Sequence, residues 1–174
     1  RLLSFNAGQP QKILTNKALS GLRSGEHLVG IDYRVAQGQL FGLGASGQLY
    51  RIDAATAAAT PVGAPAALPE GREFGFDFNP TVDRIRVVSD AGFNLRLHPD
   101  TGAVVDGDAS QPGVQLDGRL AYDSADRMAG HAPRVVAAGY TYNKDNEKIT
   151  TNYALDGAAG TLVHQGTKEG VAPS

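Results

Sequence analysis

The 174-residue sequence has no cysteine, no tryptophan and one methionine, and aromatic residues make up only 7% of it. The absence of cysteine excludes disulfides, thiol catalysis and thiolate metal sites, and it is compatible with the cytosol, the periplasm or the extracellular medium. The shortage of aromatic rings disfavours a carbohydrate site built by stacking. A formal net charge of −2, from 16 Lys and Arg against 18 Asp and Glu, supplies no basic surface of the kind that nucleic acid or an anionic membrane requires.

The sequence also lacks a long apolar run. No stretch approaches the roughly 20 apolar residues of a transmembrane helix, and Arg1-Leu2-Leu3 is too short for the apolar region of a signal peptide. We therefore expect no membrane insertion, and export would depend on a signal peptide that has been removed. What the sequence does contain, 22 Gly, 9 Pro and 41% hydrophobic residues, is typical of a single folded domain of short strands joined by tight turns.

An internal repeat is the clearest feature of the sequence. Residues 30–33 (GIDY) recur as residues 75–78 (GFDF), and the register then holds without a gap as far as Thr101. It aligns Arg51 with Arg96. The repeat step, 45 residues from Gly30 to Gly75, is typical of arrays of small supersecondary units, each of which packs against its neighbours.

Each copy of the repeat divides into four short runs of alternating apolarity, separated by glycine-containing turns such as Gln37-Gly38 and Ala91-Gly92. Such a unit matches the blade of a β-propeller. We therefore predict an all-β chain of propeller-type, four-stranded antiparallel blades, about three and a half in number, incomplete or irregularly closed. An antiparallel sandwich or open barrel is the alternative. The predicted strands are 28–34, 39–44, 48–53 and 58–63 in the first copy, and 74–79, 84–89, 93–98 and 103–105 in the second.

Partial copies flank the two complete ones. Residues 2–6 resemble residues 49–53, which places the start of the chain in the middle of a repeat. Residues 153–156 resemble residues 50–53, after an insertion that we place at 109–134.

Helix propensity arises in two segments. Within the insertion, residues 123–130 are predicted to form one short helix, with Asp123 as its N-cap and Gly130 after its last turn. The alanine-rich stretch 54–67 is interrupted by threonines and prolines, so we predict strand and loop there. The resulting map is one repeat domain over 1–174, with a partial blade at 1–20, blades at 28–65, 74–108 and 135–166, and the insertion at 109–134.

Three blocks of the second copy resemble a known family. They are residues 75–80 (GFDFNP), 83–90 (DRIRVVSD) and 94–97 (NLRL), and the resemblance extends from Leu2 to Val163. The family is a bacterial domain family of unknown function whose members repeat such blocks. The resemblance implies an exported protein with a propeller-like repeat, longer at both ends than this chain. It implies no established activity and no catalytic residue.

An aspartate and an arginine occupy matching positions in both copies. Asp32 pairs with Arg51 in this pattern, and Asp77 with Arg96, while Ala154 stands in place of the arginine in the third copy. Strand alternation puts each acid on the polar side of its blade. We interpret the pairs as structural carboxylate–guanidinium bridges from the first strand of a blade to its third. The alternative makes Asp77 and Arg96 part of a pocket for an anionic ligand or a metal.

The second copy is the more cationic one. Arg84 and Arg86 stand where the first copy has Gln39 and Phe41, and a guanidinium plane suits carboxylate, phosphate or sulfate. A simple ion pair near the turn, between neighbouring residues of the chain, is the alternative explanation. The candidate binding surface consists of Asp77, Asn79, Asp83, Arg84, Arg86, Asn94 and Arg96.

The sequence contains no recognisable catalytic or cofactor motif. Its histidines lack zinc-site spacing, its serines lack a nucleophile elbow, and no phosphate-binding glycine loop is present. We therefore predict no catalytic residue, no metal and no cofactor. The four histidines are His27, His98, His131 and His164.

The sequence thus predicts an uncharacterised, exported bacterial protein that acts as a non-enzymatic binding or scaffold module of propeller type, secreted or periplasmic, with a small molecule or a protein as partner. The alternative is a hydrolase or lyase that uses Asp32, Asp77 and arginines around a channel, because paired carboxylates can serve as acid and base. A third expectation is self-association through an unfinished blade edge, since exposed strand edges template pairing.

Overall fold

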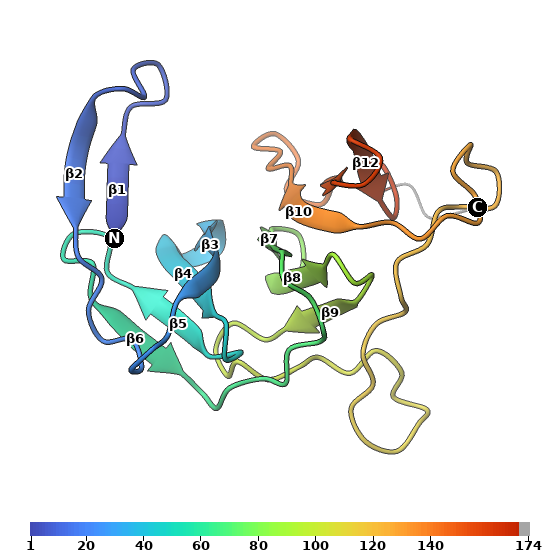
Figure 1. Cartoon of the computed structure of the whole chain (residues 1–174), viewed down its shortest axis with the longest axis horizontal. Coiled ribbons are helices and arrows are strands. Elements are labelled where there is room, and N and C mark those ends of the chain that lie inside the picture. Colours follow the sequence, from blue (N-terminus) through green and yellow to red (C-terminus); the bar gives the residue numbers. More distant parts are fainter. Residues whose placement is uncertain (171–174) are drawn as a thin grey trace.

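The computed structural model describes residues 1–170 and shows an all-β chain, as predicted. Its strands form an N-terminal hairpin and three larger antiparallel sheets, here called the first, second and third, each built from strands consecutive along the chain (Figure 1). The strands are β1 (Leu2–Phe5) and β2 (Ile13–Lys17) in the hairpin; β3 (Leu28–Arg34), β4 (Gln39–Gly44), β5 (Leu49–Ile52) and β6 (Ala59–Val62) in the first sheet; β7 (Phe74–Asn79), β8 (Arg84–Ser89) and β9 (Asn94–Leu97) in the second; and β10 (Val135–Tyr140), β11 (Asn152–Asp156) and β12 (Thr161–Gln165) in the third.

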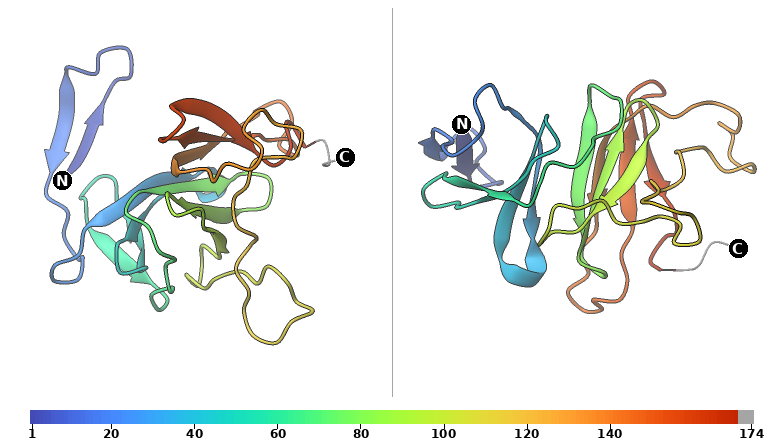
Figure 2. Two further views of the ribbon diagram at one scale, coloured as in Figure 1. Left: turned by 45° about the vertical axis from the view of Figure 1, so that its right-hand side comes forward. Right: turned by 90° about the horizontal axis from the view of Figure 1, so that it is seen from below.

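The sheets follow one another across the molecule, with the N-terminal hairpin and the third sheet at opposite ends (Figures 1 and 2). Residues 1–170 show several small antiparallel sheets and no closed propeller. The first sheet has the predicted four strands, whereas the second and the third have three each. The propeller architecture and the number of blades stay predictions.

The strand bounds follow the predicted runs closely: β3, β4, β7 and β8 match them residue for residue. The fourth predicted strand of the second copy (103–105) is wrong, because only Val104 forms a ladder bridge there. The chain turns away at Asp106, whose Oδ1 accepts the backbone N–H groups of Asp108 (3.1 Å) and Gln115 (3.0 Å). This local loop closure competes with further strand pairing.

Residues 123–130 form successive turns and no helix, so the predicted helix is wrong. Asp123 Oδ1 accepts the backbone N–H of Ala125, and Asp126 Oδ1 accepts that of Met128, both at 2.8 Å. Such bonds from an aspartate to the backbone two residues on stabilise separate turns at the expense of a helix.

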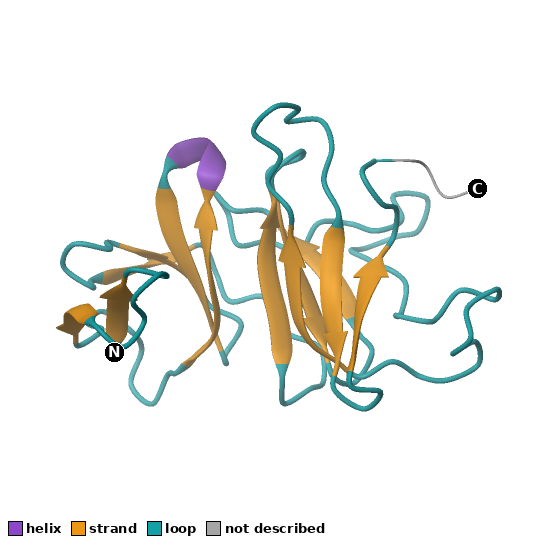
Figure 3. Ribbon diagram, turned by 90° about the horizontal axis from the view of Figure 1, so that it is seen from above, coloured by secondary structure: helices purple, strands orange, loops and turns teal. Residues whose placement is uncertain are grey.

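The described residues contain one short 3-10 turn, η1 (Val35–Gln37), which joins β3 to β4 (Figure 3). It ends at Gly38, whose φ of 63° lies in the left-handed region that favours glycine. The alanine-rich stretch 54–67 contains β6 and irregular backbone, as predicted.

The principal hydrophobic core lies between the first and second sheets. Phe41 of β4 meets Phe78 of β7 edge to face, with ring centroids 5.3 Å apart, and full burial of each such side chain contributes roughly 1.5–3 kcal/mol. Two smaller clusters extend the packing, one around Val88 and Val135 between the second and third sheets, and one around Tyr50 beneath the N-terminal segment. The core therefore spans the sheets in sequence order and holds them as neighbours.

The repeated glycine lets the first strands of the sheets approach one another. We call β3, β7 and β10 the inner strands, because they lie side by side near the middle of the molecule (Figure 1). A Cβ atom on Gly30 would lie 2.4 Å from Cβ of Phe76, and one on Gly75 would lie 2.5 Å from the backbone nitrogen of Ala138. Neither position has room for a side chain, which explains the glycine that precedes each aspartate by two residues.

Candidate functional site

The repeated aspartates connect neighbouring inner strands. Asp32 Oδ2 accepts the backbone N–H of Phe78 at 2.8 Å, and Asp77 Oδ2 accepts that of Tyr140 at 2.6 Å. Each acid thus bonds to the next inner strand along the chain, β3 to β7 and β7 to β10. A charge-assisted bond of this kind is stronger than a neutral one.

The structure gives these aspartates partners other than the arginines expected from the sequence. The strand register places Asp77 opposite Arg86, and Arg86 opposite Arg96. The expected pair is therefore separated by two inter-strand spacings of about 4.8 Å each, and nearer groups satisfy both members. In the first sheet, Arg51 is likewise two strands away from Asp32.

Asp32 and Asp77 also act on each other. Burial is the main cause that raises the pKa of Asp77 to about 7. The Tyr140 backbone N–H opposes this rise, and the neighbouring Asp32 carboxyl adds to it through repulsion and a shared hydrogen bond. The two acids line a small pocket of about 80 Å³. Its other lining residues are Tyr33, Val35, Ala36, Phe78, Pro80, Asp83, Tyr140 and Tyr142.

On the polar face of the second sheet, Asp117 holds two arginines. Its carboxylate accepts from Arg86 Nη1 at 2.6 Å, and from Arg96 Nη2 at 2.7 Å and Nε at 2.9 Å. Arg86 also donates to Asn94 Oδ1 at 2.7 Å and to the Tyr140 hydroxyl at 3.3 Å. Burial alone would raise the pKa of Asp117, but Arg96 and Arg86 lower it below its usual value.

Apart from Asp77, which bonds to the Tyr140 backbone, the predicted binding surface divides into two groups. Arg86, Asn94 and Arg96 lie together under Asp117, a residue of the insertion that sequence reasoning missed. The local sequence signal there is the Asp117-Gly118 pair, which is typical of a turn. Asp117 occupies the fork of Arg96 and Nη1 of Arg86, so these donors are not available to an anionic ligand.

The second group lies at the turn between β7 and β8. Asn79 Oδ1 accepts from the backbone N–H of Thr81 at 3.0 Å, and Arg84 Nη1 donates to the Asp83 carbonyl at 2.9 Å. Asp83 in turn accepts from Nε of the buried Arg34 at 2.8 Å, across to the first sheet. Sequence reasoning missed Arg34, because nothing in its local pattern distinguishes it from an exposed strand arginine.

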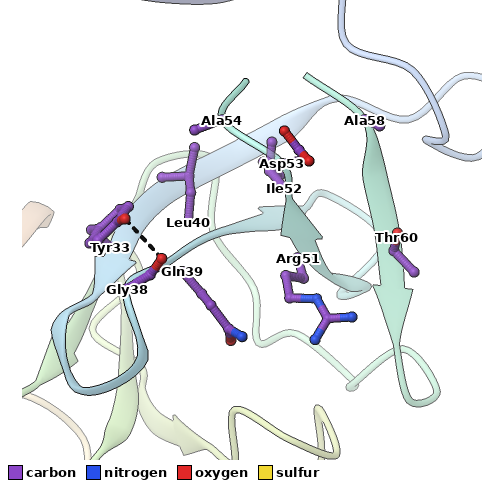
Figure 4. A pocket seen from close by; sticks show the side chains of 10 residues that line it. All are labelled: Tyr33, Gly38, Gln39, Leu40, Arg51, Ile52, Asp53, Ala54, Ala58 and Thr60. Carbon is purple, nitrogen blue, oxygen red and sulfur yellow. Dashed lines mark hydrogen bonds between the residues drawn. The ribbon is translucent and has the colours of Figure 1, made fainter. Parts of the chain in front are cut away.

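A larger pocket of about 550 Å³ lies at the margin of the first sheet, around Arg51 (Figure 4). Arg51 and Gln39 extend to the same side of the sheet, and Asp53, which directly follows β5, lines the same pocket (Figure 4). Asp53 Oδ1 accepts the backbone N–H groups of Ala55 and Thr56, both at 2.8 Å. Within residues 1–170, Arg51 takes part in no salt bridge and no side-chain hydrogen bond.

A groove of about 1140 Å³ lies between the insertion and the outer strand β12. Leu162 on β12 is 65% exposed, and the outer edge of β12 pairs with no other strand among the described residues. Besides the Arg51 side chain, this edge of β12 therefore offers backbone N–H and C=O groups that no other strand of the described residues uses.

A family model described as "Domain of unknown function (DUF4394)" matches residues 1–172. The chain belongs to this family. No match was found among curated proteins. The DUF4394 description assigns no activity, so it gives no residue of this chain a role.

Two further features of the DUF4394 domain bear on its chemistry. No helix of the described part of the chain is long and apolar enough to cross a membrane. Among the same residues, no group of three or more His, Asp or Glu side chains is arranged to hold a metal ion.

Proposed function

We propose that this DUF4394 domain is an exported, non-enzymatic binding or scaffold module of propeller type, with a small molecule or a protein as partner. The observation that supports it is the engagement of the repeat's charged groups in contacts between sheets. Asp32 and Asp77 bond to the next inner strand, and Arg86 and Arg96 bond to Asp117 of the insertion. Groups used in this way build a rigid scaffold, which leaves recognition to margins and loops. Export is proposed from the family resemblance.

Within the predicted binding surface, Arg84 is the arginine best placed to meet a partner. Its Nη1 donates to two backbone carbonyls, of Val82 at 3.5 Å and Asp83 at 2.9 Å. No salt bridge to Arg84 is formed in the part of the chain that the structure describes. We therefore propose the turn formed by Asn79, Asp83 and Arg84, all half-buried, as the part of this surface that meets the partner.

A second candidate function is a hydrolase or lyase centred on the aspartate pair. The pKa of Asp77, raised to about 7 mainly by burial and further by Asp32, favours it, because an acid that titrates near neutrality can donate and accept protons at physiological pH. The tyrosine-lined pocket beside it offers space for a small group only. The backbone bonds of both acids favour the structural role.

Turnover assays separate the two candidates. We expect the wild-type domain to leave nitrophenyl esters, phosphates and glycosides unchanged, and a uronate polymer uncleaved, at rates no higher than Asp77→Asn. Turnover that is lost in Asp77→Asn and retained in Asp108→Asn, a change at an exposed acid just before the insertion, would establish the enzyme and overturn the binding module.

A third proposal concerns assembly. The unpaired outer edge of β12 and the exposed Leu162 beside it are the features that promote strand addition by a second copy. Native mass spectrometry of the purified chain reports the assembly state directly, and a monomer across the working concentration range would contradict this proposal.

A further inference from the structure

Arg51 and Arg96 occupy equivalent places in two copies of one unit. Arg51 pairs in register with Thr60 on β6. Arg96 has the same kind of neighbour, because its carbonyl accepts the backbone N–H of Val105 at 2.8 Å. The next strand inward presents Phe41 opposite Arg51, and Arg86 opposite Arg96. The two guanidinium groups thus sit on the same face, at the same strand position, in successive sheets.

The group that binds Arg96 in the second sheet is a carboxylate of the chain itself. Asp117 binds Arg96 through both carboxylate oxygens, Oδ1 to Nη2 at 2.7 Å and Oδ2 to Nε at 2.9 Å. This is the planar, two-pronged geometry in which a guanidinium fork recognises a carboxylate. The acid comes from the insertion, a segment that follows only the second copy. The first copy has the arginine and supplies no acid to it.

The surroundings of Arg51 favour a ligand over an internal partner. Gln39, Arg51 and Thr60 lie on one face by strand alternation, and all three line the pocket of about 550 Å³ shown in Figure 4. Together they offer a guanidinium fork, an amide and a hydroxyl. Asp53 is bonded to its own turn, and Asp32 to Phe78 on the next inner strand.

We propose that Arg51 binds the carboxylate of a ligand, reproducing from outside the contact that Asp117 makes with Arg96 inside the chain. Gln39 and Thr60 hold the rest of the ligand. The carboxylate belongs either to a small organic acid or to an acidic side chain of a peptide. This inference rests on the proposed function, a binding module, and identifies its ligand class.

Titration of the full chain with succinate, and separately with a glutamate-containing peptide blocked at both ends, tests the inference. We expect saturable binding that weakens by about tenfold or more in Arg51→Gln, the loss typical of a charge-assisted two-pronged contact. Arg51→Lys keeps the charge without the fork and should fall in between. Arg23→Gln, at another exposed arginine, is the matched control and should bind as the wild type does.

The outcomes distinguish a free organic acid from an acidic side chain as the ligand, and failure of the Arg51 site from failure of the proposed function. Tighter binding of succinate indicates a free acid, and tighter binding of the peptide indicates an acidic side chain. Equal affinity for inorganic phosphate, or for the dimethyl ester of succinate, would overturn the carboxylate assignment. Affinity unchanged in Arg51→Gln, or no saturable binding by the wild type, would overturn the site itself while leaving the binding module intact. The module fails on a different result, the Asp77-dependent turnover described above.

Discussion

Asp117 binds Arg96 with both carboxylate oxygens, at 2.7 and 2.9 Å, and binds Arg86 with one of them at 2.6 Å. The carboxylate side chain is 13% exposed, against 17% for Arg86 and 31% for Arg96. One acid of the insertion therefore compensates two half-buried cations of the second sheet. The insertion is attached to the sheet by this contact and by the Leu120 N–H, which donates to the Gly92 carbonyl at 2.9 Å.

Replacing Asp117 by Asn should destabilise the fold, because it leaves two arginines partly buried without a counter-charge. We expect a loss of about 2–4 kcal/mol in the free energy of unfolding, measured by urea denaturation near neutral pH. Asp108→Asn changes an exposed acid just before the insertion and should cost less than about 0.5 kcal/mol. Equal effects of the two substitutions would show that the Asp117 contact contributes nothing specific.

Asp77 should make stability fall as pH rises. Burial, with a smaller contribution from Asp32, raises its pKa to about 7 from the ordinary 3.8, so the folded state holds a proton that the unfolded state has lost between these values. The stabilisation is fully present below the unfolded pKa and is lost as pH rises through the folded one. Solvent screening reduces the effect to about 1–2 kcal/mol. Asp77→Asn should flatten urea denaturation midpoints across this range, and a wild-type midpoint independent of pH would contradict the raised pKa.

The all-β class and most strand bounds could be predicted, because their signals are local. Alternating apolarity predicts the strands. The resemblance of residues 153–156 to residues 50–53 reflects a shared turn: Asp53 Oδ1 accepts two backbone N–H groups, and Asp156 Oδ1 does the same at 2.8 and 3.0 Å. The shared turn does not place the two segments at the same strand position. In the third sheet the matched segment is the middle strand, next to β10, whereas Asp53 follows the third strand of its sheet. Strand order depends on packing, which the repeat alone does not encode.

The polar contacts could be predicted only in part. The repeat draws attention to Asp32 and Asp77, but their partners are backbone N–H groups of other sheets, and any residue except proline can supply such a donor. Arg96 found its acid in an insertion without periodicity. Long-range pairs of this kind depend on where a loop returns to the sheet, and the spacing of residues along the chain does not predict that position.

Gly75→Ala should separate the inner strands. The added methyl would lie 2.5 Å from the Ala138 backbone nitrogen, and backbone atoms of a packed strand cannot give way, so we expect a loss of about 2–4 kcal/mol. Gly139→Ala is the matched control, since a Cβ there meets nothing within 4 Å. Chemical denaturation of both variants decides the matter, and similar stabilities would mean that the inner strands are not closely packed at Gly75.

Leu162→Lys should reduce self-association of the domain. The residue lies on β12, the edge strand of the third sheet, and is 65% exposed. A lysine on an edge strand opposes the addition of another strand, because pairing would bury its charge. If the wild type forms oligomers by native mass spectrometry, this substitution should shift the population to monomer. Val114→Lys adds the same charge at a residue of the insertion that is 62% exposed and should leave the population unchanged. A parallel loss of oligomer in both variants would point to net charge, and would argue against the β12 edge as the contact.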